Sequence, residues 1–146
     1  MKLSKALRVK NQLISQITKK RSIIIKYNSY NILNKPKWDV VEQLKELNLL
    51  VKKLIELKTK ISLANKPILE TIHLIEETKS MIALLTELPI KSGIHKDNYN
   101  NSQTEYAVFI DEVDKIKTIE NLQDTIYTQQ DILAQHNAKT EIEFIL

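Results

Sequence analysis

Residues 40–67 read VVEQLKELNLLVKKLIELKTKISLANKP, and this stretch decides the fold class. Apolar residues recur along it at steps of three and four, which is the spacing of one face of an α-helix. The apolar stripe is broad, and charged residues take the remaining faces. The stretch therefore predicts a long amphipathic helix that contacts more than one neighbour. Its stripe consists of Val40, Leu44, Leu47, Leu50, Val51, Leu54, Leu57 and Ile61.

The end of this helix is predicted at Asn65, two residues before Pro67. After glycine, asparagine is the residue that best tolerates the left-handed conformation common at helix C-termini, and proline is favoured in the first turn of the next helix. The short corner predicts that the following helix, from about Ile68 to Pro89, lies antiparallel to the first.

Two further helical patterns occupy the ends of the chain. Apolar spacing predicts one helix from about Lys2 to Tyr27 and another that starts near Ile116 and stops at Asn137. One glycine and three prolines in 146 residues also favour helices, because sandwiches and barrels need many residues with positive φ. We expect a mainly α protein, an antiparallel bundle of about four long helices in a single domain, residues 1–146.

Two short segments in the C-terminal part have strand character. Residues 106–110 are aromatic and β-branched, and residues 141–146 alternate acidic with apolar side chains. We expect these segments to pair as a small β element that caps the bundle. Residues 89–104 are polar and contain Gly93, the single glycine, so we expect an exposed loop there.

Charge is distributed unevenly along the chain. Residues 1–38 contain ten Lys or Arg and no acid, while the remainder contains 12 basic and 18 acidic residues, so the two parts carry +10 and −6. In a nucleic-acid-binding protein, Lys19, Lys20 and Arg21 of the basic helix would contact phosphates. The alternative, which we favour, is that this helix pairs with the acidic segment 105–124 of the same or another subunit.

Two motifs suggest chemistry but lack the residues that would complete a site. Asp111 and Glu112 follow an apolar segment, as the magnesium-binding acids of AAA-type ATPases do, yet no glycine-rich phosphate loop is present. Glu70 and His73 form half of a di-iron motif, and His136 lacks the Glu three residues earlier that a second half needs. We expect no catalytic residue, no cofactor and no metal site, and we interpret Asp111 and Glu112 as the polar start of the last helix.

The chain contains no cysteine, which excludes disulfides and thiolate metal sites. No stretch approaches the roughly 18 apolar residues that a membrane-spanning helix requires. The start of the chain has no apolar run long enough for the core of a signal peptide. We therefore expect a cytoplasmic protein without a membrane partner.

Three stretches, in this order, carry a family resemblance: MKLSKALRVKNQLISQI at 1–17, QLKELNLLVKKLIELKTKISLAN at 43–65 and IDEVDKIKTIENLQDTIYTQQDILAQHNAKTEI at 110–142. Together they resemble the septicolysin-like family of small, functionally uncharacterised bacterial helical proteins. The resemblance implies a helical fold and supplies no catalytic site. Ala138 stands where members of the family usually have Trp.

The apolar stripes are broader than one neighbouring helix needs. We therefore interpret the chain as a non-enzymatic, self-associating helical scaffold or protein-interaction module, with another copy of the chain as the expected partner. The alternative is a nucleic-acid-binding protein that uses the basic first helix.

Overall fold

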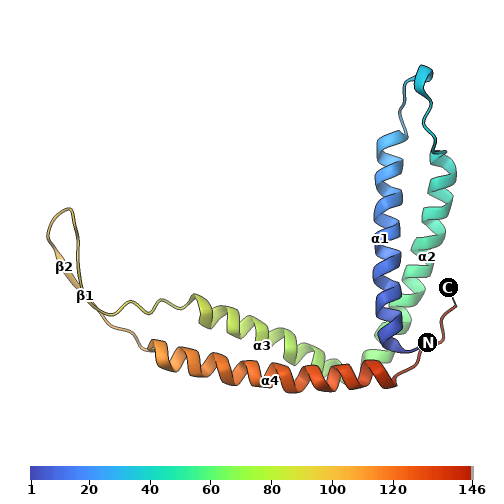
Figure 1. Cartoon of the computed structure of the whole chain (residues 1–146). Helices are drawn as coiled ribbons and strands as arrows, with labels where there is room; N and C mark the ends of the chain where they lie inside the picture. Colours follow the sequence, from blue (N-terminus) through green and yellow to red (C-terminus); the bar gives the residue numbers. More distant parts are fainter. Residues whose placement is uncertain (146) are drawn as a thin grey trace. The chain divides into compact units, whose positions relative to one another are not determined.

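The computed structural model describes residues 1–145 and is mainly α-helical, with a small antiparallel sheet, as predicted (Figure 1). The sheet lies between the last two helices. The elements in chain order are α1 (Leu3–Tyr27), the 3-10 helix η1 (Ile32–Asn34), α2 (Val40–Asn65), the 3-10 helix η2 (Lys66–Ile68), α3 (Leu69–Glu87), β1 (Gly93–Lys96), β2 (Gln103–Tyr106) and α4 (Glu112–Lys139).

The chain divides into two compact units. Unit 1 comprises Met1–Ile68 together with Gln135–Leu146, and unit 2 comprises Leu69–Ala134. Unit 1 contains α1 and α2, and unit 2 contains α3, the two strands and most of α4. That all the helices join in a single bundle stays a prediction.

In unit 1, α1 and α2 pack side by side as a helical hairpin (Figure 1). The α2 helix begins at an N-cap, Asp39, whose Oδ1 accepts hydrogen bonds from the backbone N–H groups of Val41 at 2.9 Å and Glu42 at 3.3 Å. An aspartate at this position satisfies amides that have no partner within the helix, and its negative charge is favoured there.

The α2 helix ends at Asn65, as predicted, but the expected left-handed conformation is wrong. Within residues 1–145, Asn101 is the only non-glycine residue with a positive φ. The chain stays right-handed at Lys66, whose backbone N–H donates to the carbonyl of Leu63 and begins η2. A tightened 3-10 turn satisfies the last carbonyls of a helix without a left-handed residue.

The core of unit 1 gathers side chains from three segments of the chain. The C-terminal segment contributes Ile142 and Phe144, while Glu141 and Glu143 between them remain exposed, so the predicted period of two is present in the burial pattern. The remaining buried members come from α1 and α2. They are Leu3, Ala6, Val9, Leu13, Leu57 and Ile61.

The predicted pairing of segment 141–146 with segment 106–110 is wrong. Glu141 forms a single antiparallel bridge with Lys2 at the start of the chain, and Leu146 lies outside the described residues. The backbone N–H of Ile142 donates to the carbonyl of Met1 at 2.8 Å. The first two residues of the chain therefore take the place that we had expected segment 106–110 to fill.

The two-stranded sheet lies largely within the segment that we expected to be a loop. Its register pairs Gly93 with Tyr106 and Lys96 with Gln103. Residues 107–110 are not a strand.

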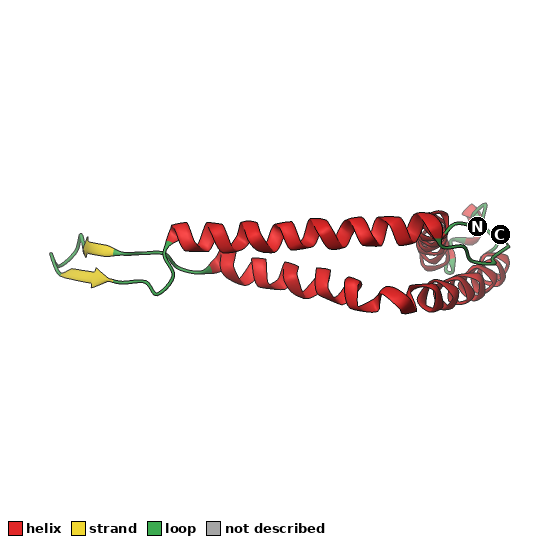
Figure 2. Cartoon of the chain, turned by 90° about the horizontal axis from the view of Figure 1, so that it is seen from below, coloured by secondary structure: helices red, strands yellow, loops and turns green. Residues whose placement is uncertain are grey.

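In unit 2, α3 and α4 form a second helical hairpin, and β1 and β2 lie in the segment that connects the two helices (Figure 2). Asp111 caps α4, because its Oδ1 accepts a hydrogen bond from the backbone N–H of Asp114 at 2.8 Å. From α4, Lys115 donates from Nζ to the carbonyl oxygens of Thr86 and Leu88, at 3.0 and 3.2 Å, and so satisfies the end of α3. The α4 helix continues two residues past the predicted stop at Asn137.

None of the helices within residues 1–145 combines the length and apolar character needed to cross a membrane.

Candidate interaction surface

The three basic residues that we predicted to contact phosphates do not share one face of α1. Lys20 points toward α2, where its Nζ donates to Oε1 of the buried Gln43 at 2.9 Å and forms an ion pair with Glu46. Lys19 is exposed, and Arg21 lines a groove. Successive residues of an α-helix are about 100° apart, so their side chains leave the helix in different directions.

The groove beside Arg21, which we call the basic groove, runs between α1 and α2 and has a volume of about 390 Å³. Its apolar lining includes Ile14, which is 39% exposed, and Ile55, which is 60% exposed. Aliphatic side chains exposed to this extent are available to a partner. None of the described residues that line the groove is acidic. They are Ile14, Ile17, Thr18, Arg21, Val51, Leu54, Ile55 and Lys58.

A second hollow along α1 and α2, of about 690 Å³, is lined by charges of both signs. It contains Leu49 and Leu50 together with three lysines and two glutamates, and one of these lysines, Lys20, already pairs with Glu46. The residues of α2 that line this hollow differ from those that line the basic groove. The two hollows thus offer different chemistry, because the second hollow contains acidic residues and the basic groove does not.

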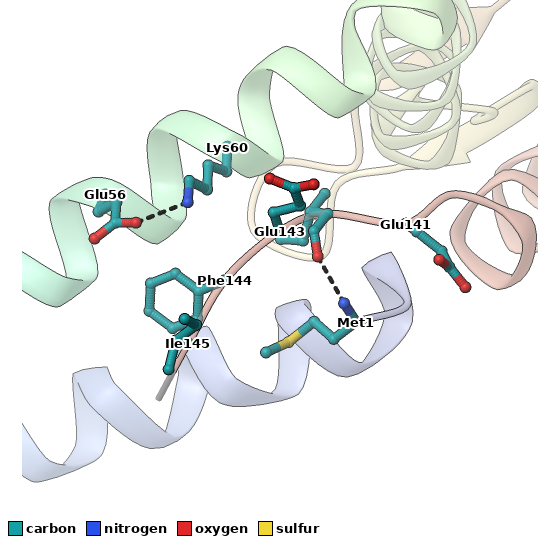
Figure 3. Close-up of a pocket in the computed structure, with 8 residues that line it drawn as sticks. Met1, Glu56, Lys60, Glu141, Glu143, Phe144 and Ile145 are labelled. Atoms are coloured by element: carbon teal, nitrogen blue, oxygen red, sulfur yellow. Dashed lines mark hydrogen bonds and ion pairs between the residues drawn. The ribbon is translucent and has the colours of Figure 1, made fainter.

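A third hollow, of about 760 Å³, lies where the C-terminal segment crosses α1 and α2 (Figure 3). The α-amino group of Met1 donates to the carbonyl oxygen of Ile142 at 2.6 Å, and Lys60 pairs with Glu56 at 2.8 Å. The ring of Phe144 lies between the ribbons of the two helices, with Nζ of Lys60 5.9 Å from its centre (Figure 3). These groups bind one another, so the hollow has the character of a structural junction.

Glu141 at the edge of this hollow is held by Lys2. The ammonium group of Lys2 lies 2.8 Å from Oε1 of Glu141. The hydrogen bond and the positive charge from Lys2 lower the pKa of the Glu141 carboxyl below its ordinary value. This ion pair reinforces the backbone bridge between the same two residues.

The residues of the ATPase-like and di-iron-like motifs make contacts that are explained by the fold. Asp111 is the cap of α4 described above, in agreement with the interpretation of the acids as the start of a helix. His73 lies 3.5 Å from Glu76 on the exposed side of α3, and Glu70 is also exposed. Among residues 1–145, no three His, Asp or Glu side chains are close enough together to hold a metal ion.

Sequence reasoning missed the role of His136. Its Nε2 lies 3.1 Å from the carbonyl oxygen of Ala64, so the end of α4 contacts the end of α2 within unit 1. The neighbouring side-chain oxygens of Asn65 and Asn137 are buried without a hydrogen-bond partner among the described residues. The position of a histidine in the last turn of a helix was the one available signal, because basic residues there contact helix carbonyls.

Unit 2 buries few apolar side chains for its size. Within Leu69–Ala134, all of which the structure describes, the buried apolar residues are Ile75, Leu85 and Ile126. Exposed large apolar residues are far more numerous and occur on both helices and in the strand region. They are Leu69, Leu74, Met81, Leu84, Ile94, Tyr99, Tyr106, Phe109, Ile110, Val113, Ile116, Tyr127 and Ile132.

No family model, no curated protein and no solved structure matches the chain. The basic groove of unit 1 and the exposed apolar side chains of unit 2 are therefore the features from which a function is inferred.

Proposed function

We propose that the protein is a non-enzymatic, self-associating helical scaffold whose partner is a second copy of the same chain. The observation that carries this proposal is the composition of unit 2, which buries three apolar side chains and exposes thirteen large ones. A helix with an apolar stripe must bury that stripe against another element to be stable. Two antiparallel helices that leave so many apolar groups in water favour a covering partner.

Unit 1 supports the same proposal. Its two helices contribute to the core of the unit and also leave apolar side chains exposed along the basic groove. Only part of the apolar stripe of α2 is therefore buried within the unit. In a homo-oligomer, exposed apolar side chains of one copy would cover those of another copy.

Binding of nucleic acid is less well supported by the contacts. Lys20, the central residue of the predicted phosphate-binding set, pairs with Glu46 and Gln43, and Lys19 and Arg21 leave α1 in other directions. We also propose, on the sequence grounds given above, a cytoplasmic location and membership of the septicolysin-like family. These two proposals do not depend on the self-association.

Sedimentation velocity of the full chain over a wide range of protein concentration tests the proposal. We expect the mean sedimentation coefficient to rise with concentration as the chain associates. Hydrogen exchange at low and high concentration should show slower exchange of α4 amides at high concentration, while β1 and β2, whose residues are all exposed, serve as an internal reference. A single monomeric species at every concentration would overturn the proposal.

A further inference from the structure

We infer that one face of α4 docks into the basic groove of a second copy of the chain. This inference rests on the proposed self-association and names the two surfaces that meet. We call the α4 surface the acidic face, and it consists of Ile116, Glu120, Asp124, Tyr127 and Asp131.

The five residues of the acidic face follow one another at steps of four, four, three and four, which places them on one side of the helix. All five are exposed, and the two apolar members, Ile116 and Tyr127, are 49% and 58% exposed. The face thus combines two apolar side chains of substantial size with three carboxylates. One basic residue, the exposed Lys117, lies three positions before Glu120 at the edge of this face.

The basic groove has the complementary composition. Ile14, Val51 and Ile55 belong to the apolar lining, and Arg21 and Lys58 supply positive charge along the same hollow. An amphipathic helix that lays its apolar side chains into a groove is a common mode of recognition between proteins. Opposite charges beside such a contact fix its register and exclude partners of the wrong sign.

The charges of the whole units favour the same pairing. Unit 1 has 17 basic and 6 acidic residues, or +11, and unit 2 has 5 basic and 12 acidic residues, or −7, which sum to the +4 of the chain. Such a split attracts unit 2 of one copy toward unit 1 of another before any contact forms. A nucleic acid would supply negative charge but no aliphatic side chain for Ile14, Val51 and Ile55, so a second copy fits the groove better.

Charge reversal on each surface provides the test. In one variant Arg21→Glu and Lys58→Glu reverse the groove, and in another Asp124→Lys and Asp131→Lys reverse the acidic face. We expect each variant alone to have a dissociation constant raised roughly tenfold or more, because like charges then face one another. An equimolar mixture of the two variants should form a mixed oligomer by sedimentation and native mass spectrometry, since the reversed charges are again complementary.

A control variant, Lys19→Glu with Lys52→Glu, makes the same change in net charge on exposed residues outside the basic groove. It should associate like the wild type. Wild-type association should weaken in about 1 M salt, where the Debye length is about 3 Å. Circular dichroism of each variant checks that the helical content is unchanged.

The outcomes separate this inference from the proposed function. If the wild type associates but both reversed variants associate equally well, or if the mixture does not recover, the docking is overturned while self-association stands. A wild type that remains monomeric overturns both. A labelled DNA duplex that binds the wild type and displaces the second copy would assign the groove to nucleic acid and would also overturn the inference.

Discussion

The imidazole of His136 near the end of α4 lies with Nε2 3.1 Å from the carbonyl oxygen of Ala64 near the end of α2. The last four carbonyls of a helix have no partner within it, and Ala64 is the second-last residue of α2. Oγ1 of Thr140 lies 3.3 Å from the other ring nitrogen, Nδ1, which holds the ring in place. A residue 72 positions away in the sequence thus completes the end of α2.

Replacing His136 with Ala should therefore destabilise the protein. We expect a loss of about 1 kcal/mol in the free energy of unfolding, measured by urea denaturation, because the Ala64 carbonyl loses its donor in a partly buried position. The same substitution at His73, which is exposed and 3.5 Å from the equally exposed Glu76, should change stability by less than about 0.5 kcal/mol. Equal effects of the two substitutions would contradict the capping role.

Lys20 provides a second prediction. The substitution Lys20→Met keeps an apolar side chain between α1 and α2 but removes the donor to Gln43 and the partner of Glu46. Since Gln43 is 8% exposed, its amide loses a buried hydrogen bond, and we expect about 1 kcal/mol lower stability in urea. Lys19→Met, on the exposed neighbouring position, is the matched control and should be close to neutral.

The core of unit 1 should be sensitive to the loss of volume. Leu57 is fully buried, so Leu57→Ala should lower the free energy of unfolding by roughly 2–5 kcal/mol through lost apolar burial and the cavity left behind. Leu63 lies on the same helix and is 67% exposed, so Leu63→Ala should have a small effect. Thermal unfolding followed by circular dichroism at 222 nm, the usual helix wavelength, compares the two variants. If the variants melt alike, the assigned core is wrong.

The Lys2–Glu141 pair gives stability a dependence on pH. Because Lys2 lowers the pKa of Glu141 in the folded protein, the folded state favours the carboxylate. The stabilisation is fully present above the ordinary glutamate pKa of 4.5 and is lost as the pH falls through the lower folded value. The difference in urea midpoint between the wild type and Glu141→Gln should therefore shrink on acidification.

Glu143→Gln removes a nearby exposed carboxylate and serves as the control for this titration. A direct measurement is the NMR titration of the Glu141 side-chain carboxyl carbon in the wild type and in Lys2→Gln. The midpoint should move upward when Lys2 is replaced. An unchanged midpoint would mean that Lys2 does not act on this carboxyl.

The long helices were predictable because their apolar periodicity extends over many turns. The bounds of α1 and α2 agree with the predicted ranges to within about one residue. The hairpin β1–β2 was not predicted, since every residue in it is exposed and no apolar alternation marks its strands. The signal available in the sequence was the presence of Asp97 and Asn101, because Asp and Asn favour turns. In the structure Asp97 accepts a hydrogen bond from the amide of Tyr99, and Asn101 has a φ of 56°.

The candidate surface was only partly predictable. The sequence locates the excess of positive charge in α1 but does not show which cations face α2. Arg21 and Lys58 are 37 positions apart and line one groove, so only the packing of α1 on α2 brings them together. The wrong partner for segment 141–146 has a similar cause, because an alternating pattern predicts burial and does not identify the neighbouring chain segment.

The divergence of Lys19, Lys20 and Arg21 around α1 has a consequence for tests of polyanion binding. The three consecutive basic residues suggest that a phosphate backbone would neutralise all of them. A backbone that approaches α1 from one side can neutralise only one, because the three side chains point in different directions. Each cation neutralised releases condensed counterions and steepens the fall of affinity with salt. Any salt dependence measured for this helix should therefore be shallower than its count of basic residues implies.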